Sequence, residues 1–600
     1  MRKILSSIIL LATFVLAKAQ NVAVNSDQWA ATDALGREVG RYDAEKKDKK
    51  VFMFYWTWHE RNDAAGTEVK NNTEIIRRFP EAMQDANHPA WTEKATGNYF
   101  WGEPLFGYYR TTDTWVLRKH AELLADAKVD GVFFDCTNGT FTWDASTDSL
   151  LLAWDQAQKD GVNVPKIAFM LPFGFNDNSL YSLRHLYKRL YSKGKFRNLW
   201  LYWDGKPVIM AYPHNLTDSE EDKAIRDFFT FRPGQPDYVD GPNPSFPNQW
   251  GWLENYPQHG YIPLPGGGFE LVTVGIAQNA CPETKGHCSA FNKPGSHSRS
   301  FSVRKGFDPR PDGYLYGWNF AEQWDRAYEL DPKAVFVTGW NEWIAGKYTR
   351  QNSPWTGDPF SFVDQFDSDR SRDIEPVKTW GDYGDVYYLQ FVDRVRKFKG
   401  TDAVQKPSAP VTLKMGQWKA WQNVLPYYPS YKGNTRHRDA KACSQYHYVN
   451  TSGRNDIVGA RVARNDKYVY FYVETADKLT SPSDSAWMRL LIDADRSKKT
   501  GWQGYDFIVN YRNPKGSKAF VQKSHQNKWI WNDCGTADIS IKDNRMMIRI
   551  PRKYICADGA ALDFEFKWSD NMQDEGNLMD FYVNGDVAPG GRFNYIYSEK

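Results

Sequence analysis

Short apolar runs alternate with helical stretches from residue 50 to residue 395, and this pattern restricts the fold more than any other feature. Runs that are apolar throughout predict strands buried on both faces, as in parallel sheets whose strands alternate with helices. The strands are expected at 51–56, 132–135, 167–171, 207–212, 270–277 and 335–338. Helical spacing lies between several of them, at 115–128, 180–193 and 321–330. About 350 residues of this pattern favour a (β/α)8 TIM-like barrel over an open doubly wound sheet.

The pattern changes after residue 411. Residues 401–411 contain two prolines and few large side chains, and we interpret them as a linker. From 412 to 600, short apolar runs are separated by turn signals and helical periods are scarce. This favours an antiparallel β-sandwich. The predicted architecture is therefore multi-domain, with a barrel over 20–400 followed by a sandwich over 412–600.

The first nineteen residues have the pattern of a secretory signal peptide. Arg2 and Lys3 precede an apolar stretch at 4–16, and Ala-Lys-Ala at 17–19 is a small-x-small cleavage site. We expect cleavage between Ala19 and Gln20, and a secreted or periplasmic bacterial protein. No cysteine follows the cleavage site to take a lipid, and no later run is long and apolar enough for a membrane span.

Composition narrows the choice of partner. The formal net charge is only +3, which argues against a nucleic-acid partner. The strands are also not followed by the glycine-rich motifs of nucleotide sites. Aromatic residues make up 16% of the chain. Such rings stack on the C–H faces of sugars, so the composition suggests a polysaccharide or glycan partner, with large β-rich cores as the alternative.

The strongest catalytic candidate is Glu342. It follows the apolar run 335–338, and functional side chains of such barrels come from the ends of strands. Trp340 and Trp343 flank it, and a desolvated carboxyl with a raised pKa suits a general acid. Asn341 is suited to bind a sugar hydroxyl. The alternative is that Asn341 and Glu342 only close a barrel strand through hydrogen bonds.

Glycoside hydrolysis needs a second carboxylate on the other side of the scissile bond. Asp135 ends the strand at 132–135, with Asn138 beyond it in the following loop. Glu103 lies in the aromatic loop 99–109, and Glu254 lies in another aromatic stretch. The second catalytic group stays a choice among Asp135, Glu103 and, less favoured, Glu254.

Further side chains near predicted strand ends are expected to bind substrate. They are Trp56, Trp58 and His59 after the first strand, Trp101 in the aromatic loop, and Gln278 after the run at 270–277. His59 is a less favoured candidate for a catalytic base.

Arg372, Asp373 and Glu375 form a separate charged group in the last loop of the barrel region. We expect them to lock that loop as an ion-pair network.

The strand order, the run Gly-Val-Phe-Phe-Asp135 and the motif Trp340-Asn-Glu-Trp343 resemble glycoside hydrolase families 71 and 99 over about residues 40–395. In family 99, which acts on α-mannosides, the motif continues as WNEW-x-E-G and both glutamates are catalytic. Here Glu342 matches the first glutamate, while Ala345 stands at the second. The resemblance implies a glycosidase barrel in which another carboxylate acts, a different linkage is cleaved, or glycan is only bound.

Residues 412–600 resemble carbohydrate-binding module family 9. The likeness rests on His437-Arg-Asp, the run 451–456, Leu-Ile-Asp-Ala-Asp at 491–495, the run 500–506 and the run 586–593. The resemblance implies a sugar site of aromatic rings, for which Trp502, Trp529 and Trp531 are the candidates. No cofactor is required, but some modules hold structural calcium. Asp493 and Asp495 are suited to it, and capping of their turn is the alternative.

The six cysteines allow disulfides in an exported protein. Cys281 with Cys288, and Cys534 with Cys556, are the pairings that we consider. A zinc site at Cys281, His287 and Cys288 is a weaker alternative.

The sequence thus predicts a secreted glycoside hydrolase that cleaves O-glycosidic bonds and carries a carbohydrate-binding module. The alternatives are a non-catalytic glycan-binding protein with a degenerate hydrolase barrel, and a polysaccharide-tethered adhesion protein.

Overall fold

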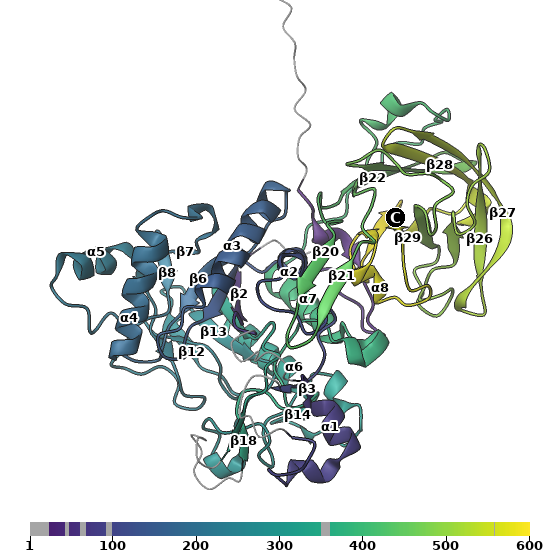
Figure 1. The fold of residues 1–600 in the computed structure, drawn as a ribbon. Coiled ribbons are helices and arrows are strands. Elements are labelled where there is room, and N and C mark those ends of the chain that lie inside the picture. Colours follow the sequence, from purple (N-terminus) through teal and green to yellow (C-terminus); the bar gives the residue numbers. More distant parts are fainter. Residues whose placement is uncertain (1–22, 43–46, 60–67, 92–98, 350–359, 557–558) are drawn as a thin grey trace, which may run out of the picture.

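The computed structural model describes residues 23–42, 47–59, 68–91, 99–349, 360–556 and 559–600. The expected signal peptide, with its cleavage site at Ala19-Gln20, lies outside these residues. Figure 1 shows a mixed helix-and-strand unit followed by a unit built almost entirely of strands. The chain is thus multi-domain, with mixed sheets in the first unit.

Six strands form the central sheet of the first unit, in the order β12-β13-β16-β2-β5-β6, and all pairs are parallel except β12 with β13. The strands are β12 (Gly260–Pro263), β13 (Phe269–Gly275), β16 (Ala334–Thr338), β2 (Lys50–Tyr55), β5 (Gly131–Asp135) and β6 (Lys166–Met170). Side chains of the four central strands are buried on both faces, which explains their continuous apolar runs.

Helices follow most of these strands. They are α1 (Asn72–Arg78), α2 (Thr114–Asp126), α3 (Asp144–Lys159), α4 (Asp177–Leu186), α5 (Glu220–Phe228), α6 (Trp318–Leu330) and α7 (Val386–Lys399). Local sequence sets their starts: Asp113 caps α2 by accepting hydrogen bonds from the amides of Trp115 and Val116. The helices predicted at 115–128 and 321–330 are confirmed as α2 and α6, and α4 begins the one at 180–193.

The prediction of a closed (β/α)8 barrel is corrected. After β6 the sheet continues only through isolated parallel bridges, from Ile167 to Trp200 and from Met170 to Met210, next to β8 (Lys206–Ile209). The short pairs that follow are β8 with β9 (Thr230–Phe231), and β10 (Gly234–Gln235) with β11 (Trp250–Gly251). Among the described residues, no ladder joins β11 to β13, so one closed sheet is not formed. Pro233 interrupts the run from β9 to β10, since proline has no amide hydrogen to donate.

The remaining strands of this unit are short. They are β3 (Lys70–Asn71), β4 (Tyr99–Phe100), β7 (Tyr202–Trp203), β14 (Phe301–Ser302), β15 (Gly306–Phe307), β17 (Lys347–Thr349) and β18 (Phe360–Phe362).

The second unit is one large antiparallel sheet of twelve strands, not the predicted sandwich of two sheets. Its order is β1 (Trp29–Ala30), β31 (Asn594–Ser598), β29 (Asp563–Asp570), β24 (Arg489–Asp493), β25 (Phe507–Val509), β26 (Lys518–His525), β27 (Lys528–Lys542), β28 (Arg545–Pro551), β23 (Tyr468–Thr475), β22 (Ile457–Arg464) and β19 (Tyr427–Pro429), with β30 (Asp586–Ala588) paired to β29. Register shifts between β26 and β27 let this pair bend while staying hydrogen-bonded. The sheet curves into a half-barrel instead of splitting in two (Figure 1).

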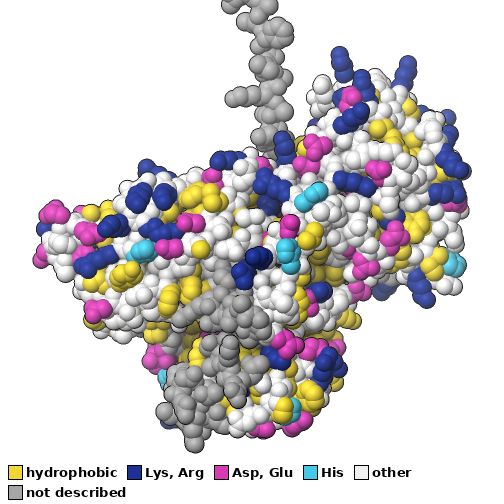
Figure 2. All heavy atoms as spheres, viewed as in Figure 1, with side chains coloured by type: hydrophobic (Ala, Val, Ile, Leu, Met, Phe, Trp, Pro, Cys, Tyr) yellow, Lys and Arg dark blue, Asp and Glu magenta, His cyan; other side chains and the backbone are white. Residues whose placement is uncertain are grey.

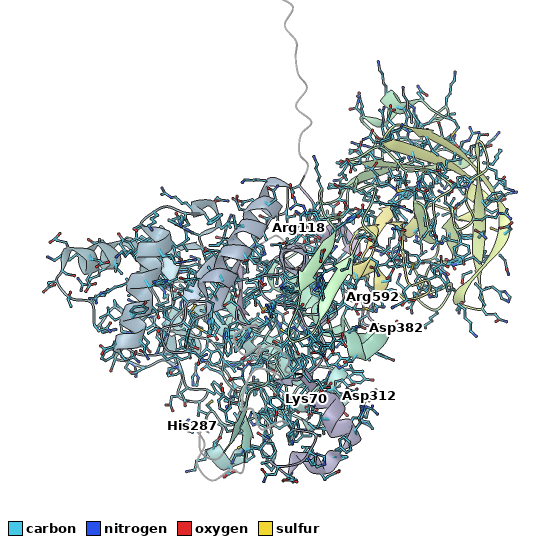
Figure 3. The ribbon with its side chains drawn as sticks, in the orientation of Figure 1. Lys70, Arg118, His287, Asp312, Asp382 and Arg592 are labelled. Carbon is cyan, nitrogen blue, oxygen red and sulfur yellow. The ribbon has the colours of Figure 1, made fainter. Side chains whose placement is uncertain are left out.

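Polar contacts join the two units. Arg592 donates to the carboxylate of Asp385 at 2.8 Å and to the backbone carbonyl of Asp382 at 2.6 Å. Figure 3 labels Arg592 and Asp382 at this junction. A separate hairpin of β20 (Arg438–Lys441) and β21 (His447–Asn450) also reaches the first unit, where Arg438 pairs with Asp113 at 2.7 Å. Moreover, β1 precedes the parallel sheet in the chain but pairs with β31 of the second unit.

All six cysteines are among the described residues, and neither of the two disulfides that we considered is formed. Within the described ranges, no helix has both the length and the apolar character that a membrane crossing needs. On the face in Figure 2, basic and acidic side chains are intermixed, as the balanced charge leads one to expect.

Candidate active site

Glu342 lies just past the end of β16 and is almost fully buried, with 1% of the residue exposed. Its Oε2 accepts hydrogen bonds from Gln365 Nε2 and from Arg372 Nε, both at 3.1 Å. Burial raises the pKa of Glu342, and the Arg372 guanidinium opposes this rise. Glu342 is therefore a desolvated carboxyl beside a fixed cation, an environment that active sites use to tune proton transfer.

Asp364 shares this guanidinium. Arg372 Nη2 lies 3.3 Å from Asp364 Oδ1 and 3.5 Å from Glu342 Oε1. Because both oxygens contact one nitrogen atom, they are at most about 7 Å apart, so the two carboxyl groups are not too far apart for a glycosidase pair. The side chain of Asp364 is 40% exposed, so this member of the pair reaches solvent.

Asp135 ends β5, as predicted, and is buried. Its Oδ2 accepts a hydrogen bond from Trp58 Nε1 at 3.2 Å, and its Oδ1 accepts from the amide and hydroxyl of Thr137. Burial raises the pKa of Asp135, and the Asp364 charge adds to this rise. The Asp135 charge in turn raises the pKa of Glu342. Asp135, Glu342 and Asp364 thus form one electrostatic group.

The other carboxylates that we considered lie elsewhere. Glu103 forms an ion pair with Lys378 at 2.6 Å. Glu254 is buried and accepts hydrogen bonds from His259 and Thr273. Within the described residues, neither of them forms a hydrogen bond or ion pair with Glu342. Asp364, which the sequence reasoning did not single out, is joined to Glu342 through Arg372.

A stack of aromatic rings leads from Asp135 to the surface. Trp56 and Trp58 stack with ring centroids 3.8 Å apart, Trp58 and Trp143 at 5.0 Å, and Trp143 and Phe141 at 5.0 Å. Phe141 is exposed at the outer end. Asn138, in the same loop after β5, is also exposed. The sequence predicted Trp56 and Trp58, but not Trp143 and Phe141, whose position depends on how the loop turns back.

Three buried polar groups in this region have no hydrogen-bond partner in the part of the chain that the structure describes. They are the indole nitrogens of Trp56 and Trp252 and the side-chain amide of Gln278. The Arg372 guanidinium lies 5.5 Å from the Trp252 ring, so Trp252 borders the pair formed with Glu342. Buried polar groups normally have partners, so these unpaired groups stand out in the region around Glu342.

The predicted aromatic residues at 101, 340 and 343 are fully buried. Trp101 stacks on Trp343 at 4.6 Å and donates to Asp373 at 2.7 Å, while Trp343 donates to Glu375 at 2.6 Å. Asp373 also accepts a hydrogen bond from the amide of Glu342 at 2.6 Å. These residues hold the backbone that carries Glu342.

Asn341 and His59 contribute to the same scaffold. The side chain of Asn341 bonds the amide and carbonyl of Trp56, at 2.9 and 3.2 Å. His59 contacts the Asn341 carbonyl through Nε2 at 2.9 Å, and burial lowers the pKa of His59 to about 3. A histidine with this pKa is neutral near pH 7.

Trp502, Trp529 and Trp531 come together on one face of the large sheet. Their ring centroids are 4.4 Å apart for Trp502 and Trp529, and 5.4 Å apart for Trp529 and Trp531. Trp502 and Trp531 are buried, whereas Trp529 is half-buried and donates to Glu575 at 3.2 Å. Trp529 is the ring of this group that is open to a ligand.

Asp493, Asp495 and Asp506 place oxygen atoms within 4.8 Å of one another, near the predicted calcium position. However, Lys498 Nζ lies 2.7 Å from Asp493 and 2.9 Å from Glu565 and already supplies a positive charge. Asp495 also accepts hydrogen bonds from the amide of Ser497 and the hydroxyl of Thr500. The residues present therefore fit a capped, lysine-neutralised turn better than a resident calcium ion.

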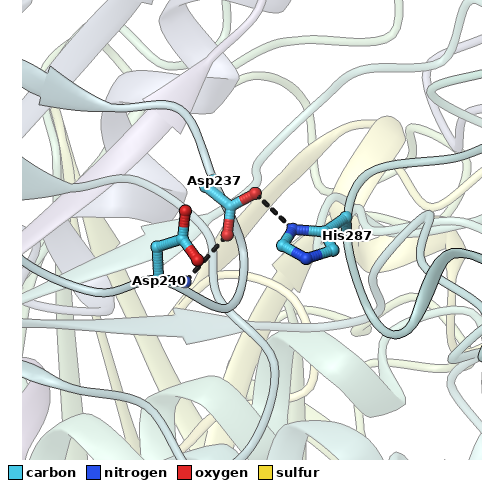
Figure 4. Close-up of side chains that lie close together, drawn as sticks. All are labelled: Asp237, Asp240 and His287. Atoms are coloured by element: carbon cyan, nitrogen blue, oxygen red, sulfur yellow. Dashed lines mark hydrogen bonds and ion pairs between the residues drawn. The ribbon is translucent and has the colours of Figure 1, made fainter.

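His287 turns to Asp237 rather than to Cys281 and Cys288, so the zinc arrangement that we considered is not formed. His287 Nδ1 lies 2.7 Å from Asp237 Oδ2, and Asp240 lies next to them (Figure 4). Asp237 Oδ1 accepts hydrogen bonds from the amides of Val239 and Asp240. These hydrogen bonds explain why Asp237, Asp240 and His287 lie together: they stabilise the loop.

No model of a known protein family matches the chain, and no curated protein matches it. Two solved structures of the family 99 endo-α-mannosidase from Bacteroides thetaiotaomicron are similar to it. One, in complex with bis-tris propane, is 14% identical, with a TM-score of 0.33, over 58% of this chain and 97% of that chain. The other is 15% identical, with a TM-score of 0.31, over 59% and 98%. We therefore base the functional assignment on the geometry of the site.

Proposed function

We propose that the protein is an exported glycoside hydrolase that cleaves O-glycosidic bonds in a polysaccharide or glycan. The observation that carries this proposal is the shared contact of Glu342 and Asp364 with Arg372, which keeps their oxygens at most about 7 Å apart. A pair at this separation supplies the two carboxylates that the reaction needs.

In this reaction Glu342 is the general acid, because burial raises its pKa and favours the protonated form that donates to the leaving oxygen. Asp364 lies on the solvent side of Arg372 and acts as the second carboxylate, either as the base that activates water or as the nucleophile. Asp364 would thus take the role of the second glutamate of the family 99 motif, a position that Ala345 occupies in this sequence.

Sugar rings would be held by the stack of Trp56, Trp58, Trp143 and Phe141 and by the unpartnered donors of Trp56 and Trp252. The inner rings of the stack cover one another, so the exposed outer ring, Phe141, offers the apolar face that a sugar would meet. The indole N–H groups would donate to sugar hydroxyls, which relieves two unpaired buried donors.

A second candidate is a non-catalytic glycan-binding protein with a degenerate hydrolase unit. The observation that favours it is that donors of the protein already bind both oxygens of the Glu342 carboxylate. Gln365 and Arg372 donate to Oε2, and Arg372 also donates to Oε1. A carboxylate fixed in this way can serve structure alone.

The deciding experiment is a screen of neutral and charged polysaccharides with the purified protein and with Glu342→Gln, followed by NMR of the products. The proposal expects reducing ends from at least one glycan, lost in Glu342→Gln. The first anomer released assigns Asp364 as nucleophile (retention) or base (inversion). Binding of a glycan without any product would support the second candidate instead.

A further inference from the structure

A groove with a volume of about 670 Å³ lies between the two units. The loop at 105–107 forms one side, the end of β21 forms another, and the segment at 571–584, which includes α8 (Asp580–Val583), completes it. Figure 1 shows the β20–β21 hairpin next to α8 at this junction. No residue of this groove belongs to the group around Glu342.

The groove lining is mixed and carries no net charge. Its uncharged polar part consists of amide and hydroxyl side chains, among them Asn450, Thr451, Ser452, Asn571, Gln573 and Asn577, while Leu105, Phe106, Val449, Met579 and Val583 supply apolar contacts. The charged lining residues balance, with Lys378 and Arg438 against Asp574 and Asp580. Such a surface offers many hydrogen-bond donors and acceptors but no net field to attract an ion. The ligand class that matches it is a neutral polyol.

The floor of the groove is held in place by its own hydrogen bonds. Asn450 donates to the Val583 carbonyl at 2.9 Å, and Asn571 donates to the Ser452 carbonyl at 2.6 Å. The rim residues Thr451, Gln573 and Asp574 are exposed. A rigid floor lowers the entropic cost of ordering side chains when a ligand binds.

One loop borders both the groove and the candidate active site. Leu105 and Phe106 line the groove, while Trp101 of the same loop stacks on Trp343 beside Glu342. Leu105 N donates to Pro376 O at 2.8 Å, which fixes the loop to the segment that follows Asp373 and Glu375. A ligand in the groove is thus held against the same loop that supports the active-site backbone.

We propose that this junction groove is a binding site for neutral oligosaccharide, separate from both Glu342 and the Trp529 face. The inference rests on the proposed function in taking glycan as the ligand. It adds that the glycan substrate is bound by both units together, and not by the strand-rich unit alone.

The test uses full-length protein carrying Glu342→Gln, so that binding is measured without turnover. Calorimetric titrations use the hexasaccharides of glucose (both α-1,4 and β-1,4), mannose and xylose, with a heparin hexasaccharide as the charged probe. Thr451→Arg fills the groove rim and Gln573→Ala removes a polar group. Thr536→Arg, at an exposed position on β27 outside the groove, is the matched control.

We expect at least one neutral hexasaccharide to bind. Thr451→Arg should lower the affinity for it at least tenfold, and Gln573→Ala should lower the affinity by a smaller factor. The affinity of Thr536→Arg should stay within twofold of the parent. The inference fails if Thr451→Arg binds like its control, if only heparin binds, or if no neutral probe binds. Turnover of the unsubstituted protein reports on the proposed function separately: groove binding without product keeps this inference and removes that function.

Discussion

Glu342 Oε1 and Asp364 Oδ1 contact the same atom, Nη2 of Arg372, at 3.5 and 3.3 Å. The first carboxylate is buried, while the second is 40% exposed. Burial raises the pKa of Glu342, which suits an acid, whereas Asp364 reaches solvent, where a second carboxylate can act. Arg372 is the element that sets their spacing.

Glu342→Gln and Asp364→Asn are each expected to lower kcat by about two to four orders of magnitude, the range found for positioned acid–base groups. The double variant should be little worse than either single one, because residues that act as a unit are not additive. Glu103→Gln is the control, since Glu103 pairs with Lys378, and it should keep near-normal turnover. Circular dichroism checks folding, and normal kcat in Asp364→Asn would remove Asp364 from the mechanism.

Replacing Arg372 by Met should move the alkaline limb of the pH–rate profile upward. Activity needs protonated Glu342 and falls as pH rises through its pKa. Burial raises this pKa and Arg372 opposes the rise. Removing the guanidinium raises the pKa further, so the acid stays protonated to higher pH, although kcat falls because the spacing is lost.

Arg370→Met is the control for this experiment, because Arg370 pairs with Asp367 in the same loop. The measurement is kcat against pH for both variants. A limb that moves downward in Arg372→Met would contradict the assignment of Glu342 as the acid.

The sequence predicted Glu342 and Asp135 because each follows an apolar strand, and strand ends share one edge of a parallel sheet. It did not predict the role of Asp364 or Arg372. Both lie in a loop beyond the last strand of the first unit, where no hydrophobic periodicity indicates which way a side chain points. The sequence also did not predict that Trp340 and Trp343 are fully buried, because the motif does not specify whether its rings point to the core or to the cleft. Closure of the barrel was also not as predicted, because no ladder joins β11 to β13 among the described residues, and Pro233 breaks the strand between β9 and β10.

Trp529→Ala should weaken retention on insoluble polysaccharide while Tm changes little, because this ring is half-buried. Trp502→Ala should instead lower the free energy of unfolding by about 3–5 kcal/mol, as expected for a buried tryptophan. Pull-down and thermal unfolding separate the two effects. Trp418→Ala, at another partly buried tryptophan of this unit, is the control. Unchanged retention in Trp529→Ala would exclude this face as a sugar site.

Lys498→Met should make the protein respond to calcium. Lys498 Nζ contacts Asp493 at 2.7 Å and Glu565 at 2.9 Å, and Asp495 and Asp506 place oxygens nearby. Without the ammonium group these carboxylates repel one another, so the Tm of Lys498→Met should fall in EDTA. It should recover in part with millimolar CaCl₂, because oxygen ligands bind calcium and a bound ion stabilises the folded state. The unsubstituted protein and Lys499→Met, an exposed neighbour, should have the same Tm in both buffers. A drop in Tm of the unsubstituted protein in EDTA would show instead that calcium is a resident ion beside Lys498.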